Sequence, residues 1–554
     1  MYKGKNLNFD NIKPNSQSLL TRKINFRDKN DLIKNVEKEK NINFAKKSNL
    51  IIFLLTVSFI SFVSFNLLKI SFQKDKNYTA FQNKKIKKRG KVLDNNNEIV
   101  ATSLETKDLY IDLRKSLDRS VLKENLIDIF ENKSEDFFDK IFERNQYSLI
   151  SKDLSLTDIN KLKLLGDPAI QLHKSNKRVY PQHNLFSHII GLKTSNLSSK
   201  LEKNLDYKLS EGEDIKLTLD LRVQNIVRDE LQKSIENYQA KSALALIMNV
   251  NNGNIVSMVS LPDFNPNYPK LILPNTENNL LTEARYEMGS TLKIFNAAIA
   301  YELNSRAQNQ EFDISNGLQI TNKKKIIDNE IKKKILNFDE VFIKSSNIGS
   351  VKILESIGYE SQESFYDLVG LKDKLKIEGL KTVSNKLPNN WESHSKFISY
   401  GYGISVSPIS LATAFCSLVN GGYKIEPKLI NLEKENSHQQ ILSSKTSQKI
   451  NSLIKKIVTD GTGKFALVNG VSVGGKTGTS KKAEMGSYSD NKVITSFIGV
   501  FPSENPKFLT FVLFDEPETN INNSPDNTGG NTAAPTFSKI VKKISPIIDI
   551  DNYF

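Results

Sequence analysis

The sequence predicts an α+β chain of several domains that follows a single N-terminal membrane-spanning helix. Three observations carry this prediction: a length of 554 residues, one uncharged apolar segment near the start, and strand-like runs that alternate with helix-like runs from about residue 91. At roughly 150 residues per domain, this length corresponds to about three or four units. An apolar share of 38% is enough for a large buried core, which excludes a globally disordered chain.

The net charge of +16 is concentrated at the N-terminus. Residues 1–91 hold 21 Lys and Arg against 6 Asp and Glu, whereas the other 463 residues hold 57 against 56. A protein that binds phosphate backbones needs its basic surface in the folded body, so this distribution argues against nucleic-acid binding. The single cysteine, Cys416, excludes an intrachain disulfide and a multi-cysteine metal site, and the five histidines are scattered.

An uncharged stretch between Lys47 and Lys69 predicts a transmembrane signal anchor. It holds 21 residues, of which 14 are apolar. At about 1.5 Å per residue, a helix of this length spans about 30 Å, the thickness of a bilayer core. The preceding leader is too long for a cleaved signal peptide. We therefore assign residues 1–48 to a basic cytoplasmic leader and residues 49–69 to the anchor, although basic residues on both flanks only weakly favour this orientation.

Residues 70–235 are expected to form the next domain. A basic stalk covers residues 70–90, strand-like runs begin near Lys91, and residues 121–165 have helical patterns. No repeat of 20 to 50 residues is visible.

Residues 236–554 are expected to form the C-terminal domain. The apolar run at residues 243–250 is typical of a strand covered on both faces. A turn and a second strand-like run at residues 254–261 follow, which predicts a hairpin.

The first of three short motifs is S-T-L-K, from Ser290 to Lys293, at the start of a helix-like run. Residues i and i+3 share a helix face, so the lysine amine can reach the serine hydroxyl. A helix N-terminus adds backbone N–H groups and a partial positive charge for a developing anion. The same spacing recurs elsewhere, as at Ser452 and Lys455, so this motif carries little weight alone.

The second motif places Ser345, Ser346 and Asn347 at the head of another helix-like run. A hydroxyl and an amide can relay a proton and bind a substrate amide, although a plain helix cap would use the same residue types. Residues 489–491 also read S-D-N, but they follow the third motif and stand in the wrong order.

The third motif, Lys476 to Thr479, reads K-T-G-T and is the only K-T-G in the chain. It follows a strand-like run with two glycines, which allow another backbone to approach closely. A strand edge can pair with an extended peptide, while the lysine and the threonine hydroxyls suit a carboxylate. A hairpin turn would explain the same residues.

The order of the motifs decides between these interpretations. The S-x-x-K motif is followed after 55 residues by S-x-N, and K-T-G comes a further 131 residues on. This ordered set is the pattern of serine acyltransferases that recognise penicillin.

On these motifs the chain resembles the class B penicillin-binding proteins over about residues 85–545. The stretches R-G-K-V-L-D from Arg89 and R-V-Y-P from Arg178 are also similar to that family, and the S-Y-G-Y-G run around Tyr402 is similar to its division-specific, FtsI-type members. The resemblance implies an elongated, β-rich pedestal of the dimerisation type before residue 235. It implies a penicillin-binding, β-lactamase-like domain after it, with an antiparallel sheet flanked by helices.

The same resemblance implies a septal D,D-transpeptidase that cross-links peptidoglycan stem peptides through a serine acyl-enzyme, without metal or cofactor. The implied catalytic residues are Ser290, Lys293, Ser345 and Lys476, and the implied substrate-binding residues are Asn347, Thr477, Gly478 and Thr479. β-Lactams are the implied inhibitors.

The implied partners are a D-Ala-D-Ala donor peptide, an amine acceptor, a polytopic membrane glycan polymerase and other division proteins. The implied location is the bacterial inner membrane, with one membrane pass and the catalytic domain in the periplasm. Three alternatives stay open on the sequence: an elongation-specific transpeptidase, an idle scaffold or β-lactam sensor with this fold, and a carboxypeptidase that lets water attack the acyl-enzyme.

Overall fold

The computed structural model describes residues 50–69, 88–144, 146–192, 200–322, 324–431, 439–484, 487–518 and 527–548. The chain divides into two compact units, Met1–Ile86 and Lys87–Phe554. Among the described residues, one helix, Leu50–Lys69, is long and apolar enough to cross a membrane. The predicted leader and nearly all of the predicted basic stalk lie outside the described residues.

The pedestal is built on a five-stranded sheet. Its strands are β1 (Val92–Leu93), β2 (Ile99–Asp112), β3 (Tyr147–Ser151), β4 (Ile170–Val179) and β5 (Ile215–Lys216). The long β2 pairs antiparallel with β4 from Thr102, opposite Val179, to Ile111, opposite Ile170. β3 pairs with the far end of β2, whereas β1 connects the near end of β2 to β5. The β-rich pedestal that the family resemblance implied is thus a long β2–β4 ribbon.

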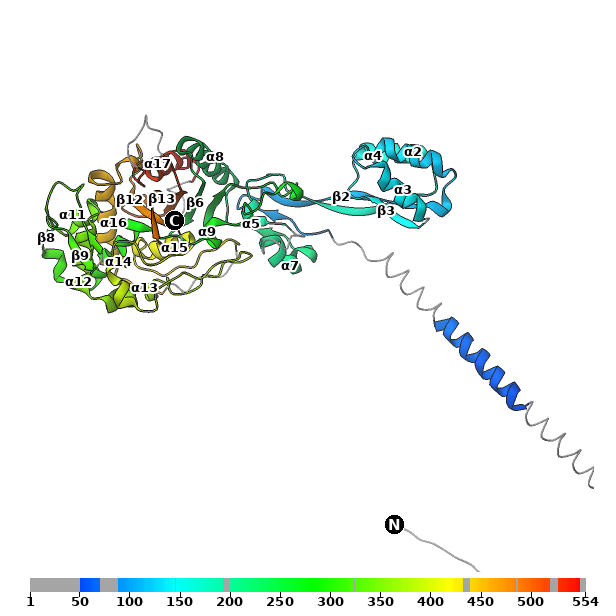
Figure 1. Cartoon of the computed structure of the whole chain (residues 1–554), viewed down its shortest axis with the longest axis horizontal. Coiled ribbons are helices and arrows are strands. Elements are labelled where there is room, and N and C mark those ends of the chain that lie inside the picture. Colours follow the sequence, from blue (N-terminus) through cyan, green and yellow to red (C-terminus); the bar gives the residue numbers. More distant parts are fainter. Residues whose placement is uncertain are drawn as a thin grey trace, which may run out of the picture. The chain divides into compact units, whose positions relative to one another are not determined.

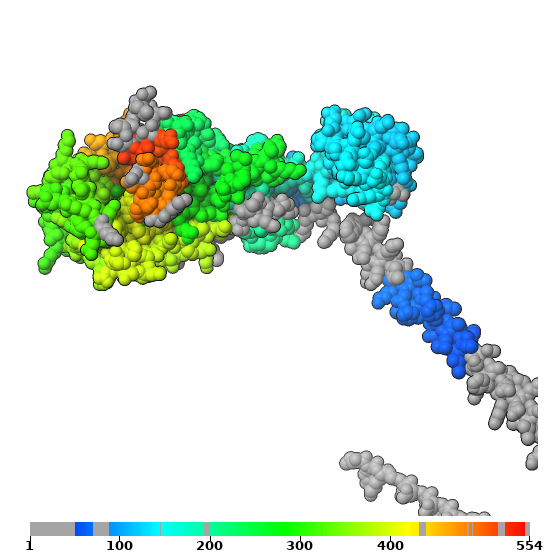
Figure 2. Space-filling model, viewed as in Figure 1, coloured from blue at the N-terminus to red at the C-terminus, as the bar shows by residue number. Residues whose placement is uncertain are grey.

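Three helices enclose a separate small core around the far end of β2. They are α2 (Arg119–Ile129), α3 (Glu135–Arg144) and α4 (Leu156–Leu165). Side chains such as Leu126 and Phe138 meet Ile150 of β3 in this core, and Figure 2 shows the resulting pedestal head in cyan. β3 interrupts the helical stretch predicted for residues 121–165, because its residues pair with the free edge of β2.

A buried ion network holds the base of the pedestal, where the short helices α5 (Ser187–Ile190), α6 (Leu201–Asn204) and α7 (Asp206–Ser210) lie. The carboxylate of Glu202 is fully buried and accepts hydrogen bonds from Nε of Arg89 at 2.9 Å and Nε of Arg178 at 2.6 Å. Arg178 also donates to the Gly90 carbonyl at 2.7 Å. Two guanidinium groups on one carboxylate offset the cost of burying these charges. The R-G and R-V-Y-P stretches of the sequence therefore meet at the carboxylate of Glu202.

The C-terminal domain contains a second five-stranded sheet, entirely antiparallel. In spatial order its strands are β12 (Gly474–Glu484), β13 (Ser487–Phe501), β14 (Phe508–Asp515), β6 (Ser242–Asn249) and β7 (Ile255–Leu261). Successive side chains of a strand point to opposite faces. Accordingly, Ala243 and Ala245 belong to one hydrophobic cluster, whereas Leu244 and Leu246 belong to the other. The predicted doubly covered strand and hairpin are confirmed.

Helices cover both faces of this sheet (Figure 1). α8 (Leu221–Tyr238) and α17 (Ala533–Ile544) pack on one face. The other face belongs to the larger cluster, which draws on α9 (Leu280–Glu283), α10 (Lys293–Glu302), α11 (Phe338–Ile343), α12 (Asn347–Ile357), α13 (Tyr359–Leu368), α14 (Trp391–Ile398), α15 (Pro408–Val419) and α16 (Ser444–Asp460). Four short strands form two small ribbons beside them: β8 (Phe312–Asp313), β9 (Leu318–Thr321), β10 (Lys324–Ile326) and β11 (Ile335–Leu336).

The sequence-based boundary at residue 235 falls inside α8. Val223, Val227 and Leu231 of this helix are buried in the cluster that α17 and the C-terminal sheet also form. Helix α8 thus packs with the C-terminal domain, and a boundary before Leu221 fits the structure better.

Candidate active site

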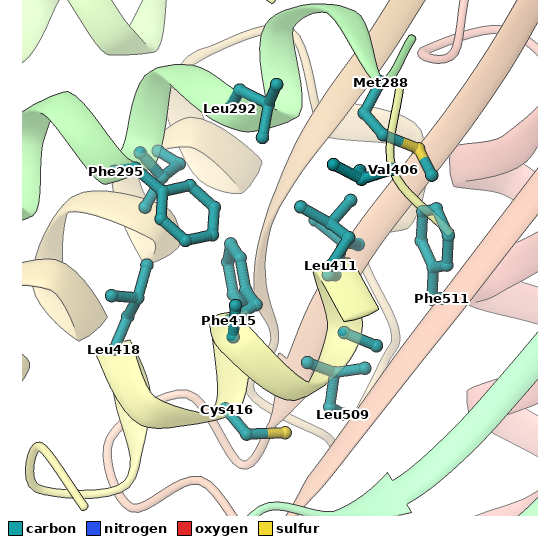
Figure 3. Packing of buried hydrophobic residues seen from close by; sticks show 14 of the residues in the cluster. Met288, Leu292, Phe295, Val406, Leu411, Phe415, Cys416, Leu418, Leu509 and Phe511 are labelled. Carbon is teal, nitrogen blue, oxygen red and sulfur yellow. The ribbon is translucent and has the colours of Figure 1, made fainter. Parts of the chain in front are cut away.

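Ser290 lies in a 3₁₀ turn, η3 (Gly289–Leu292), that leads directly into α10. The neighbours Met288 and Leu292 are buried, and Figure 3 shows them in one cluster with Leu411 and Phe415 of α15. Apolar packing of Met288 and Leu292 thus holds the turn in place. Ser290 itself is half-buried, and its hydroxyl has no hydrogen bond to the described part of the chain.

Close backbone contacts hold this turn against β12. Gly289, at φ +55°, lies against the backbone of Thr479, and its N–H donates to the Gly401 carbonyl at 3.1 Å. Gly401, at φ +103°, lies against Gly289 in turn, so that a Cβ on either glycine would overlap the neighbouring backbone. Ser480 of β12 also donates to the Glu287 carbonyl at 2.6 Å. The serine is therefore held beside the edge strand of the sheet.

Lys293, the first residue of α10, is fully buried and bonds into the second motif. Its Nζ donates to the Ser345 carbonyl at 2.5 Å and to Oδ1 of Asn347 at 2.7 Å, and it lies 3.3 Å from Oγ of Ser345. Burial lowers the pKa of Lys293 to about 7, while the negative charge of Asp328 acts to raise it. Near neutral pH a substantial fraction of this amine is therefore free to accept a proton.

Lys476, also fully buried, approaches Ser345 from β12. Its Nζ donates to Oγ of Ser345 at 3.0 Å and to the Thr477 carbonyl at 3.2 Å. Burial, followed by the neighbouring Lys293 cation, holds the pKa of Lys476 well below its ordinary value. The Ser345 hydroxyl thus lies between two amines, in a chain of hydrogen bonds along which a proton can move.

Sequence reasoning missed Asp328, a buried carboxylate that holds the start of α12. Its Oδ2 accepts hydrogen bonds from Oγ of Ser346 at 2.5 Å and from the Ile348 N–H at 3.1 Å. Its Oδ1 accepts from the Asn347 N–H at 3.1 Å. Asp328 stands in an irregular segment between β10 and β11, where no motif spacing or periodic pattern marks it.

The K-T-G-T residues lie within strand β12 and not at a hairpin turn. Lys476 pairs across the sheet with Ile498 of β13, and β12 is the edge strand. Thr477 and Thr462 share a hydroxyl–hydroxyl bond of 2.9 Å, while the Gly529 N–H donates to Oγ1 of Thr479 at 3.0 Å. An edge strand offers backbone groups to an added peptide strand.

The alternative S-D-N match falls at the start of β13. Oγ of Ser489 accepts a hydrogen bond from the Lys492 N–H at 3.3 Å, which is a contact within that strand. By contrast, the structure links Lys293, Ser345, Asn347 and Lys476 through direct hydrogen bonds.

Comparison with known families agrees with this geometry. Residues 243–542 match the penicillin binding protein transpeptidase domain, and residues 85–215 match the penicillin-binding protein dimerisation domain. The chain belongs to the penicillin-binding proteins. The dimerisation domain ahead of the transpeptidase domain corresponds to the class B organisation that the sequence resemblance predicted, and that prediction is confirmed.

Individual relatives cover most of this penicillin-binding protein. It is 29% identical over 484 residues to the Caulobacter vibrioides protein named probable peptidoglycan D,D-transpeptidase FtsI, covering 83% of this chain and 82% of the relative. It is 25% identical over 575 residues to stage V sporulation protein D of Bacillus subtilis, covering 94% of this chain and 87% of the relative. A crystal structure from Atopobium parvulum DSM 20469 has a TM-score of 0.64 at 20% sequence identity. The match covers 84% of this chain and 98% of the chain in the crystal, and it shows the shared fold alone.

Proposed function

We propose that this penicillin-binding protein is a septal peptidoglycan D,D-transpeptidase that works through an acyl-enzyme on Ser290. The observation that carries the proposal is the hydrogen-bonded chain of Lys293, Ser345 and Lys476, which adjoins the nucleophile turn and an edge strand. The similarity to FtsI over 83% of the chain supports the division-specific assignment that the run around Tyr402 suggested.

The first half-reaction forms an ester. Oγ of Ser290 attacks the carbonyl carbon between the two terminal D-alanines of the donor peptide, and Nζ of Lys293 accepts the hydroxyl proton. The N–H groups of Ser290 and Thr479 donate to the developing oxyanion, and each such donor contributes about 3 to 4 kcal/mol in measured enzymes. The peptide bond then breaks, and Ser345, assisted by Lys476, passes a proton to the departing D-alanine.

Substrate binding uses the edge of β12 and the residues around it. The donor peptide adds to this edge as an extended strand. The Asn347 side chain binds a donor amide, and Gly478 lets β12 lie close to the nucleophile turn. The terminal carboxylate is received by Lys476, Thr477 and Thr479.

The second half-reaction transfers the acyl group. The amine of a neighbouring stem peptide attacks the ester carbonyl, a new amide bond forms, and the ester bond to Ser290 breaks. The proton that the attacking amine loses passes to the departing oxygen of Ser290, which returns the enzyme to its starting state.

The helix Leu50–Lys69 supports a single-pass membrane anchor. The leader lies in the cytoplasm, and the pedestal and transpeptidase domain lie in the periplasm, where peptidoglycan is cross-linked. The anchor and the pedestal offer surfaces to a polytopic glycan polymerase and to other division proteins.

Fluorescent penicillin tests the acyltransferase site on the full chain in detergent. We expect stoichiometric labelling of the wild type and of Ser489→Ala, and no labelling of Ser290→Ala. The Ser489 variant is the matched control, since this serine belongs to the alternative S-D-N match. A folded wild type that takes up no label would contradict the enzyme assignment and favour an idle scaffold.

Depletion of the protein in its own cells tests the septal role. Filaments are expected if cross-linking at the septum stops. Round cells would instead indicate the elongation-specific alternative.

The acylation rate should fall as pH drops through about 7. Burial lowers the pKa of Lys293 to about 7, and a general base must be neutral to accept a proton. At pH 6 we expect a rate roughly tenfold below the plateau, because about one amine in eleven is then unprotonated. Stopped-time labelling between pH 5.5 and 9 measures this, with circular dichroism as the check on folding. A flat profile down to pH 5.5 would exclude Lys293 as the base.

A further inference from the structure

We propose that Asp328 is a positioning residue of the acylation reaction, which holds the turn that carries Ser345 in place beside Lys293. The inference rests on the proposed function and deepens it. It assigns a role to a residue that touches neither the substrate nor the reacting serine.

Asp328 contacts the residues that directly follow Ser345 in the chain. Its two carboxylate oxygens accept three hydrogen bonds, from the Ser346 hydroxyl and from the backbone N–H groups of Asn347 and Ile348. The Asp328 side chain is 7% exposed, so water competes little for these bonds. The carboxylate therefore fixes three consecutive residues that directly follow Ser345.

Ser345 needs such support because its backbone is strained. Its φ of +59° lies in the left-handed region, which L-residues with a Cβ seldom adopt and which persists only where the surroundings enforce it. In this conformation both the carbonyl oxygen and the hydroxyl of Ser345 are within hydrogen-bonding range of Nζ of Lys293. If the turn relaxes, both contacts to the general base are disturbed.

Asp328 also balances the charge of the site. Lys476 brings a second amine to Ser345 from β12, while Asp328 approaches from the segment between β10 and β11. The negative charge of Asp328 favours the protonated form of Lys293 and so opposes the effect of burial on the pKa of that lysine. Removal of the charge should thus free the amine at lower pH.

The central experiment compares Asp328→Asn with the wild type as full chains in detergent. Asparagine keeps the shape of the side chain but removes the charge and one of the two acceptor oxygens. We expect the plateau rate of acylation by fluorescent penicillin to fall by about tenfold or more, since the turn loses its position. We also expect the acidic limb of the pH profile to move down by about one pH unit.

Ser346→Ala separates the positioning effect from the charge effect. This variant removes the 2.5 Å bond to Asp328 and the cap bond that Oγ of Ser346 accepts from the Gly349 N–H, and it keeps the Asp328 carboxylate. We expect a lower plateau with an acidic limb at the wild-type pH. An unchanged plateau would contradict the proposal, and this comparison also decides the matter if Asp328→Asn does not fold.

Asp220→Asn is the matched control for the loss of a carboxylate charge at the start of a helix. The Asp220 carboxylate accepts from the N–H groups of Arg222 and Val223 at the start of α8. We expect a lower melting temperature and an unchanged acylation profile.

The outcomes distinguish the two levels of inference. If Asp328→Asn merely melts earlier and keeps the wild-type plateau and acidic limb, Asp328 is only a helix cap and the proposal fails. A wild type that is inert towards penicillin would contradict the proposed function itself, and this inference with it.

Discussion

Lys293→Met is expected to abolish acylation and, at the same time, to stabilise the fold. Loss of a general base typically costs about 10² to 10⁴-fold in rate. The stability gain follows from burial: this amine is fully buried, and its pKa is lowered to about 7 from an ordinary value of 10.5. Each unit of that shift corresponds to about 1.4 kcal/mol. After subtraction of the lost bonds to Ser345 and Asn347, we expect a net gain of about 1 to 3 kcal/mol.

The gain should depend on pH in a defined direction. Below about pH 7 both folded and unfolded lysine are protonated, and the wild type pays the full cost of a buried cation. Between pH 7 and 10.5 the unfolded chain binds more protons than the folded one, so wild-type stability rises with pH. The advantage of Met should therefore be largest at and below pH 7 and disappear towards pH 10.5. Thermal melts of both proteins across this range measure it.

Lys455→Met is the control for this prediction. Lys455 stands at the same S-x-x-K spacing after Ser452, but it is 46% exposed and pairs with Glu504. We expect neither a rate loss nor a stability gain. If Lys293→Met were less stable than the wild type, the hydrogen bonds of the amine would outweigh its desolvation.

The sequence predicted the elements of the site better than their surroundings. The spacing of Ser290 and Lys293 correctly indicated the entry to a helix, and Ser345 and Asn347 correctly indicated the start of another. The extent of β12 was not foreseen, because buried Lys476 interrupts the apolar pattern that marks a strand. Functional residues often break the local rules in this way.

The sequence does not show which distant segments contact one another. Asp328 and Gly401 stand in irregular segments, and only the folded chain brings them to the Ser345 and Ser290 turns. The sequence left the place of α8 (Leu221–Tyr238) in the fold open for a related reason. An amphipathic pattern indicates that α8 is a helix, but it does not reveal which sheet its apolar face covers.

Gly401→Ala is expected to disable the site without any change to a reacting group. A Cβ at this position would overlap the backbone carbonyl and Cα of Gly289, the residue directly before the nucleophile. A φ of +103° is also hardly accessible to alanine. Relief of the overlap requires Gly289 to move and to carry Ser290 with it. Because a displacement of about 1 Å can cost 10²-fold in rate, we expect a loss of that order.

Gly470→Ala is the control that separates the cost of backbone strain from the cost of overlap between the new Cβ and a neighbouring backbone. Gly470 has a comparable φ of +82°, but a Cβ there has nothing within 4 Å. It should lose about 1 to 2 kcal/mol of stability through the backbone and keep the wild-type rate of penicillin labelling. Gly401→Ala should instead show both losses, in the melt and in the labelling rate. If Gly401→Ala were acylated at the wild-type rate, Ser290 would not depend on the close contact of the two glycine backbones, and the apolar packing of Met288 and Leu292 alone would suffice to hold the turn.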